Sequence, residues 1–176
     1  MENQRMMENS AMLTLKDKIK DIRIAMMTTR DDTGHLRSRP MATHDIDVDG
    51  TLWFFTKEHS PKVDEIESIE NDINLSYMST NQNLFVSVSG KAVLVKDKAK
   101  INELWNPLLK AWFPQGLDDP ELALLKVTID QAEYWDAPSN RMIQVIGVIK
   151  AAITGKEYKP GEHGKMNFET PSPSET

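Results

Sequence analysis

The chain contains no cysteine among its 176 residues. This absence excludes a disulfide, a thiolate-bound metal and a cysteine nucleophile. Long hydrophobic runs are absent as well, since none approaches the roughly 20 residues that a membrane-spanning helix needs. The N-terminal segment lacks the basic and apolar regions of a secretory signal. We therefore expect a cytoplasmic protein that has no membrane partner.

Positive charge is in deficit, because 27 acidic residues outnumber 21 basic ones and the formal net charge is −6. A protein that binds nucleic acid needs a basic surface for the phosphates, so no nucleic-acid partner is expected. No Gly-x-Gly-x-x-Gly loop is present, which argues against a Rossmann domain. The four histidines, His35, His44, His59 and His163, lack the spacing of metal ligands, and we expect no metal site.

The length of the chain fits a single domain, since 176 residues split in two would leave two small halves. Residues 1–12 are polar and rich in methionine without a regular period, which predicts a flexible leader. The folded domain is expected to span residues 13–153. Residues 154–176 are rich in Gly, Pro, Ser, Thr and Glu, a composition typical of a disordered tail.

Short strand-like segments separated by turn residues dominate the folded part of the chain. They cover residues 22–29, 35–42, 44–48, 51–56, 73–79, 84–95, 124–135 and 142–153. Asp49-Gly50 joins two of them through a tight hairpin turn, because both residues tolerate positive φ. Short helices are predicted at residues 13–21, after Ser60-Pro61 and after Asp97. Strands that follow one another directly predict an antiparallel barrel of about six or seven strands with peripheral helices.

Two arginines, Arg37 and Arg39, lie two residues apart on the predicted strand 35–42 and therefore project from the same face. Side by side, their guanidinium groups repel each other unless an anion or a carboxylate lies between them. The planar guanidinium fork suits a phosphate or an electron-rich ring edge. The pair thus indicates either an anion site or a solvated strand face that is paired to nearby acids.

A second candidate anion site is the helix start at Ser60-Pro61-Lys62. The first turn of a helix presents unsatisfied backbone N–H groups and a partial positive charge, which favour phosphate. Lys62 adds a full charge and Ser60 a hydroxyl. Val63 occupies the position where a capping box has Glu, so no side chain is expected to reach back over this end. The alternative is an ordinary capped helix.

Aromatic residues gather on the strand 51–56, where alternation places Trp53 and Phe55 on one face and Phe54 and Thr56 on the other. One face is expected in the core, and the other is a candidate wall for a flat aromatic ligand. Two later clusters, at residues 112–114 and 134–136, are candidates for a ligand cover or an interface. Packing of the barrel end is the alternative for both clusters.

Taken in order, these segments resemble the general stress protein family of the FMN-binding split-barrel superfamily, whose members are relatives of pyridoxamine 5′-phosphate oxidase. The resemblance is carried by Arg37-Ser38-Arg39-Pro40-Met41, residues 52–56, Ser60-Pro61-Lys62, Val88-Ser89-Gly90, Glu103-Leu104-Trp105, residues 112–116 and residues 133–136. It extends over residues 13–153. The resemblance implies a split antiparallel β-barrel that forms a homodimer, with FMN at the subunit interface.

The resemblance also implies residue roles at the FMN site. The strand that meets the flavin ring and its phosphate corresponds to Arg37, Ser38, Arg39 and Pro40. The strand along the isoalloxazine ring corresponds to Phe54, Phe55 and Thr56, and the phosphate seat to Ser60 and Lys62. The residues expected from the second subunit are Ser89, Gly90, Trp112, Phe113 and Trp135. None of these residues is assigned a catalytic role.

The function that the resemblance implies is that of a flavin-dependent oxidoreductase of the general stress protein type, acting on a small substrate with a donor such as NADPH. A flavin-binding carrier, buffer or stress sensor without turnover is the alternative, and FAD or haem could replace FMN as the ligand. The segment Asp136-Ala137-Pro138-Ser139-Asn140-Arg141 lacks the Arg-x-His motif of true pyridoxamine phosphate oxidases. Oxidation of vitamin B6 is therefore not expected.

Overall fold

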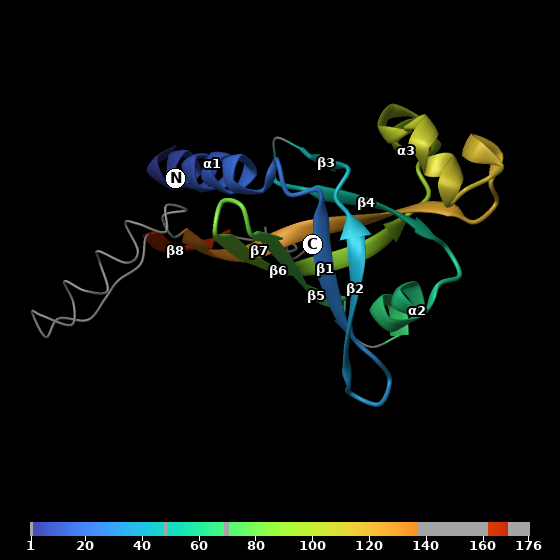
Figure 1. Ribbon diagram of the computed structural model, residues 1–176, viewed down its shortest axis with the longest axis horizontal. Coiled ribbons are helices and arrows are strands. Elements are labelled where there is room, and N and C mark those ends of the chain that lie inside the picture. The colour runs from blue at the N-terminus through green and yellow to red at the C-terminus, as the bar shows by residue number, and fades with distance from the viewer. Residues whose placement is uncertain (1, 48, 69–70, 137–161, 169–176) are drawn as a thin grey trace, which may run out of the picture.

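A computed structural model describes residues 2–47, 49–68, 71–136 and 162–168. Within these ranges, eight strands form one sheet and helices lie beside it (Figure 1). The strands are β1 (Ile24–Arg30), β2 (Leu36–Ala42), β3 (Asp45–Ile46), β4 (Leu52–Lys57), β5 (Asp72–Ser79), β6 (Leu84–Val95), β7 (Leu122–Asp136) and β8 (Glu162–Asn167). The helices are α1 (Glu2–Ile19), α2 (Pro61–Ser68), α3 (Lys98–Leu104) and the 3₁₀ helices η1 (Pro107–Ala111) and η2 (Gly116–Asp118).

The described strands pair in the order β2-β1-β5-β6-β7-β4-β3, with β8 added beside β7, and each of these pairs is antiparallel. The sheet curls, so that β1 and β2 run across the direction of β4 and β7 (Figure 1). This curl brings the end strand β2 into contact with β4, although the two strands are not paired. The half-barrel confirms the predicted antiparallel barrel with peripheral helices.

The hairpin at Asp49-Gly50 forms as predicted. The Asp47 N–H donates to the Thr51 carbonyl at 2.9 Å, and the Gly50 N–H donates to the Asp47 carbonyl at 3.0 Å. Gly50 has a φ of 83°, a conformation that favours glycine because a Cβ would be crowded there. The turn brings β3 and β4 together and so places the aromatic strand β4 beside the segment that follows β2.

The N-terminal helix is longer than predicted. It begins at Glu2, whereas the sequence indicated a flexible leader over residues 1–12 and a helix only from residue 13. Leu15 and Ile19 are both buried in the main core, which agrees with the apolar spacing of the predicted helix. The residues before position 13 lack an apolar period, so the pattern carried no signal for the first part of α1.

The predicted disordered tail contains the strand β8. This strand pairs with residues 131–136 of β7, which is 15 residues long and offers a free edge there. A polar segment can cover such an edge through backbone hydrogen bonds alone, so composition did not reveal it. The strand predicted at residues 142–153 and the remainder of the tail lie outside the described residues.

Hydrophobic side chains of the described residues form two clusters, one on each face of β4. The main cluster joins α1 and α2 to the sheet and includes the fully buried Phe54, Leu75 and Leu125. The second cluster consists of Trp53, Phe55, Ile101, Leu109, Phe113, Leu122 and Leu124. Because side chains alternate along a strand, Phe54 joins the first cluster and Phe55 the second. The second cluster attaches α3 and η1 to the sheet.

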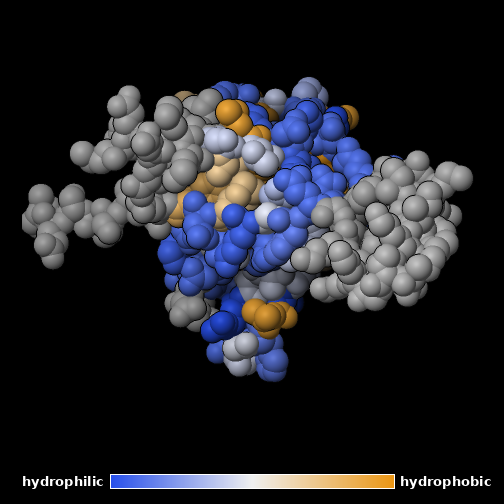
Figure 2. Space-filling view, turned by 90° about the vertical axis from the view of Figure 1, so that its left-hand side faces the viewer, coloured by the Kyte–Doolittle hydropathy of each residue, from blue (hydrophilic) through white to orange (hydrophobic). Residues whose placement is uncertain are grey.

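The end of the molecule that carries α1 and β8 shows a mainly hydrophilic surface with smaller apolar areas (Figure 2). One small apolar area lies at the bottom of this view, where the β1–β2 hairpin ends. In the part of the chain that the structure describes, no helix is both long enough and apolar enough to cross a membrane.

Candidate functional site

A cavity of about 520 Å³ lies where β2 faces β4, between the start of α2 and the helix η1, and we call it the β2–β4 pocket. Its lining residues are Ile24, Pro40, Met41, Ala42, His44, Phe55, Thr56, Lys57, Ser60, Lys62, Leu109, Trp112 and Phe113. The wall of this pocket is mainly apolar. A hollow of about 580 Å³ beside β5 and β6 has a mainly polar wall. The β2–β4 pocket is therefore the better site for an apolar ring.

One side of the pocket is formed by β2, which is an end strand. Among the described strands β2 pairs only with β1, so part of its backbone points away from the sheet. Pro40 is tolerated here because an edge position does not need the N–H that proline lacks. Pro40 thus gives the pocket an apolar surface at a strand edge, beside Met41 and Ala42.

Phe55 supplies the flat aromatic wall from β4. Its ring is edge-on to His44, with 4.7 Å between the ring centroids and 81° between the planes. Its centroid also lies 6.1 Å from that of Trp105 and 6.4 Å from that of Phe113. Contacts on several sides hold the ring in one orientation, so this wall is rigid and apolar.

The helix start at α2 forms as the sequence indicated. The Ser60 carbonyl accepts hydrogen bonds from the N–H groups of Val63 at 2.8 Å and of Asp64 at 3.2 Å. Pro61 occupies the first helical position, where its missing N–H costs no helical hydrogen bond. The Ser60 side chain is turned to Lys62 instead of capping the helix.

Lys62 and Ser60 form a cationic end of the pocket. Lys62 Nζ donates to Ser60 Oγ at 3.2 Å, and the Thr56 hydroxyl lies 3.4 Å from the same oxygen. Burial lowers the pKa of the Lys62 ammonium, Arg39 lowers it further, and Glu65 raises it. The charge of this half-buried group is therefore destabilised, and a bound anion would stabilise it.

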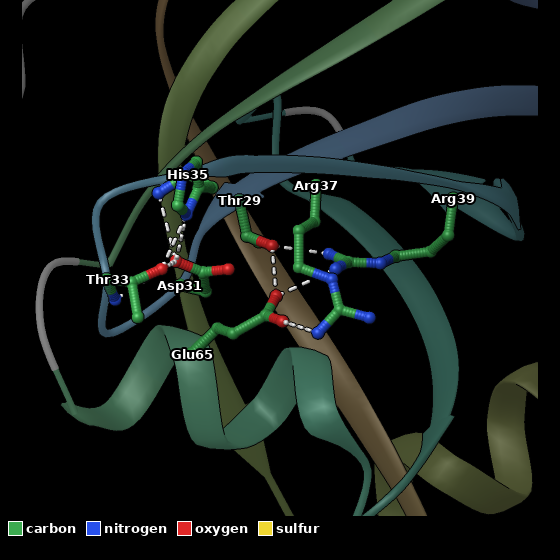
Figure 3. Close-up of polar contacts among 7 residues, drawn as sticks. All are labelled: Thr29, Asp31, Thr33, His35, Arg37, Arg39 and Glu65. Atoms are coloured by element: carbon green, nitrogen blue, oxygen red, sulfur yellow. Dashed lines mark hydrogen bonds and ion pairs between the residues drawn. The ribbon is translucent and has the colours of Figure 1, made fainter.

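The paired arginines meet the carboxylate of Glu65 on α2 (Figure 3). Glu65 is only 6% exposed. Arg39 Nη2 donates to Glu65 Oε2 at 2.7 Å, and Arg37 Nη1 donates to Glu65 Oε1 at 3.2 Å. The Thr29 hydroxyl donates to Glu65 and accepts from Arg39. The two arginines are therefore paired with a nearby acid, which is the second of the two possibilities that the sequence offered. Two guanidinium groups nevertheless share one carboxylate, which leaves surplus positive charge near Lys62.

A histidine that the sequence did not indicate as a ligand contact, His44, also lines the pocket. Its backbone N–H donates to the Trp53 carbonyl at 2.9 Å, which fixes the segment between β2 and β3 against β4. Among the described residues the imidazole nitrogens have no hydrogen-bond partner. Burial lowers the pKa of His44, although Asp45 opposes this effect, so the ring is mainly neutral at pH 7.

The sequence of residues 10–159 matches the family model described as pyridoxamine 5′-phosphate oxidase like. The chain belongs to this family. Protein bli-3 from Neurospora crassa is a similar protein, with 35% identity over 159 residues, which cover 81% of this chain and 76% of that protein.

Solved structures with this fold include stress proteins. One from Jannaschia sp. CCS1, described as general stress protein 26, has a TM-score of 0.70 and 24% identity, and the match covers 90% of this chain and 99% of that chain. The general stress FMN/FAD binding protein from Xanthomonas citri has a TM-score of 0.57 and 29% identity, over 75% of this chain and 89% of that chain. These likenesses confirm the split-barrel fold and the family that the sequence predicted.

In this family member, half of the residues expected to bind the ligand line the β2–β4 pocket. They are Pro40, Phe55, Thr56, Ser60, Lys62, Trp112 and Phe113. Arg37 and Arg39 are held at Glu65, three residues after Lys62 on α2. The lining residues that sequence reasoning missed are Ile24, Met41, Ala42, His44, Lys57 and Leu109.

Phe54 and Ser38 do not face the pocket. Phe54 is fully buried in the main core, on the face of β4 opposite Phe55, so its side chain cannot touch a ligand there. The Ser38 hydroxyl lies 2.7 Å from that of Thr28 and does not join the cluster at Glu65. Both differences arise because neighbouring residues of a strand project to opposite faces.

Trp112 and Phe113 were expected from a second subunit, but they line the pocket of their own chain. The helix η1 places them there. It begins after Asn106, whose side chain accepts the Leu108 N–H at 2.9 Å. Its residue Leu109 is buried against β4 in the second cluster. Phe113 is 3% exposed and Trp112 is 64% exposed, so the first closes the pocket wall and the second lies at its mouth.

Ser89, Gly90 and Trp135 lie outside the pocket of their own chain, on β6 and β7. Gly90 approaches β7 so closely that an added Cβ would lie 2.2 Å from the Thr128 carbonyl oxygen. The ring of Trp135 stacks on that of His163 of β8, with 5.3 Å between the centroids. The structure thus gives Gly90 and Trp135 contacts within the sheet of their own chain.

Proposed function

We propose that the chain binds FMN in the β2–β4 pocket and acts as a flavin-dependent oxidoreductase on a small substrate. One observation carries the proposal above all: an apolar cavity with an aromatic wall ends at the half-buried Lys62, whose charge an anion would stabilise. FMN combines a flat ring system with a terminal phosphate and fits this arrangement. Family membership and the FMN/FAD binding named for the Xanthomonas citri relative support a flavin.

Each end of the pocket offers groups for one part of FMN. Lys62 and Ser60 would hold the phosphate through charge-assisted hydrogen bonds, while Phe55 would face the ring system. Glu65 fixes Arg39 near Lys62, which adds positive potential at the phosphate end. Bound FMN would supply the electron and hydride transfer. The residues of the chain bind the cofactor, orient it and shield one of its sides from water.

FMN is proposed in preference to FAD because its single terminal phosphate matches the cationic end at Lys62 and Ser60. Haem would bring two propionates and would need an axial ligand, for which His44 would be the candidate among the lining residues. The absorption spectrum of the purified protein distinguishes the two ligands. A flavin spectrum supports the proposal, and a Soret band would contradict it.

Turnover of a small substrate is proposed over a carrier, buffer or stress sensor. The observation that favours turnover is the exposure of Trp112, which lines the pocket but is 64% exposed. A side chain so exposed does not plug the pocket, so a substrate could enter beside a bound ring. Reduction of the bound flavin by NADPH or NADH, followed by reoxidation with a small acceptor, would support the enzyme. Flavin that stays oxidised would support the carrier.

We also propose that the protein works as a cytoplasmic homodimer. Trp135 is 43% exposed and lies outside the pocket of its own chain. A second copy would be needed to bring this residue to a bound flavin. The dimer would then hold two sites, each built mainly by one chain and completed by the other.

The phosphate assignment is tested by removing the charge of Lys62. The denatured protein should release FMN, which chromatography identifies. Lys62→Met should weaken FMN binding about ten- to hundredfold because a charge-assisted hydrogen bond is lost. Lys98→Met removes an exposed lysine of α3 and should leave FMN binding unchanged. Equal affinities of Lys62→Met and the unchanged protein would refute the assignment.

A further inference from the structure

The β2–β4 pocket has a second polar end, formed by His44. The backbone of His44 is bonded to that of Trp53, near the first residue of β4, whereas Ser60 and Lys62 follow the last residue, Lys57. Trp53 and Lys57 are four positions apart along the strand, a length of about 13 Å at the usual rise of a strand. Phe55 lies midway between them. A ligand that lies along Phe55 can therefore have its phosphate at Lys62 and its other end at His44.

The imidazole of His44 is free to contact such a ligand. It is half-buried, it faces the pocket, and its ring contact within the described residues is the edge-on contact with Phe55. No hydrogen bond from a described residue reaches its nitrogens. A neutral imidazole offers one N–H donor and one nitrogen acceptor. A polar group in an apolar wall sets the orientation of a bound ligand, whereas the apolar surface mainly retains it.

Resting on the proposed function, we propose that His44 forms the ring-end contact of the site, where its imidazole hydrogen-bonds to the polar edge of the flavin ring. That edge alternates carbonyl oxygens with ring nitrogens, so it offers both acceptors and a donor to a neutral imidazole. Lys62 and His44 then act on different parts of the same molecule. Lys62 holds the phosphate, and His44 sets the position of the ring along Phe55.

Riboflavin, which has the ring but no phosphate, separates the two contacts. Dissociation constants of FMN and riboflavin are measured by fluorescence quenching with flavin-free protein. His44→Phe keeps an aromatic ring against Phe55 but removes both nitrogens, and it should weaken both ligands about tenfold and equally. His44→Gln retains a donor and an acceptor and should restore most of the affinity. Lys62→Met should weaken FMN and leave riboflavin unchanged.

The outcomes keep this inference apart from the proposed function. If the unchanged protein binds neither ligand, the flavin proposal fails and the role of His44 fails with it. If it binds both, and His44→Phe leaves both affinities unchanged or weakens FMN alone, the ring-end contact is refuted while the flavin site stands. Unchanged thermal midpoints of the flavin-free variants show that folding is not the cause. His44→Leu is the second apolar variant, should His44→Phe fail to fold.

Discussion

At the scale of the residue, Glu65 explains how two adjacent arginines are accommodated. The residue is only 6% exposed, and its carboxylate receives hydrogen bonds from Arg37, Arg39 and Thr29, all of which lie on the hairpin of β1 and β2 (Figure 3). A buried carboxylate is stable only when its oxygens are paired in this way. Glu65 therefore connects α2, which begins next to the cationic end of the pocket, to the edge strand β2.

Removing this charge should destabilise the protein. Glu65→Gln leaves a single acceptor oxygen for three donors, and we expect the free energy of unfolding to fall by about 2 kcal/mol, as for other hydrogen bonds to charged groups. Urea denaturation followed by circular dichroism measures the change. Glu67→Gln, at an exposed position of the same helix, should change the value by less than about 0.5 kcal/mol. Equal effects of both substitutions would contradict the role of Glu65.

At the scale of the element, the β6–β7 pair shows why Gly90 is required. The register of the pair shifts between Ser89 and Gly90, where Gly90 lies opposite Ile129 and Ser89 opposite Gln131. At this irregularity the backbone of β7 comes close enough to exclude any side chain on Gly90. The close approach of β7 therefore explains why position 90 is a glycine, without any contact to a flavin.

Gly90→Ala should therefore be strongly destabilising. The added Cβ meets a backbone carbonyl, which cannot move without shifting β7, and we expect a loss of about 3 kcal/mol in the free energy of unfolding. Gly34→Ala is the matched control, because a Cβ added at Gly34 would meet nothing within 4 Å, unlike one at Gly90, and only its φ of 87° opposes the substitution. Its cost should stay near the conformational penalty of about 1 kcal/mol. A loss at Gly90 no larger than that at Gly34 would contradict the close approach.

At the scale of the whole molecule, one apolar row crosses the sheet on its exposed side. Met78 of β5 lies opposite Phe85 of β6, which in turn lies opposite Trp135 of β7. These side chains are 59%, 42% and 43% exposed, respectively. Large apolar side chains exposed side by side are typical of a surface that another protein covers. The row is therefore the surface on which we expect the second copy of the proposed homodimer.

A charge in this row should dissociate the dimer. The unchanged protein is expected to have the mass of two chains by light scattering, and Phe85→Lys the mass of one, because a desolvated lysine has no partner there. Leu108→Lys places the same charge at another exposed apolar residue, on η1, and should leave the dimer intact. A single-chain mass for the unchanged protein would contradict the proposed homodimer. A dimeric Phe85→Lys would place the interface elsewhere.

The sequence by itself determined the local elements around the site. Alternation predicted that Phe55 and Phe54 lie on opposite faces, and Asp49-Gly50 predicted the hairpin that leads into β4. Ser60-Pro61 predicted the start of α2. These features depend on neighbours a few residues apart, through side-chain period, positive φ and the free N–H groups of a helix start, so they can be derived without the fold.

Only the tertiary structure decided which of these elements meet. The partner of the arginines is Glu65, 26 and 28 residues away in the chain, and Trp112 reaches the pocket of its own chain through η1. His44 faces the pocket because the curl of the sheet brings β2 to β4. Such contacts depend on strand order and curvature, and these arise from the packing of the whole sheet. A sequence pattern that spans a few residues cannot predict such contacts.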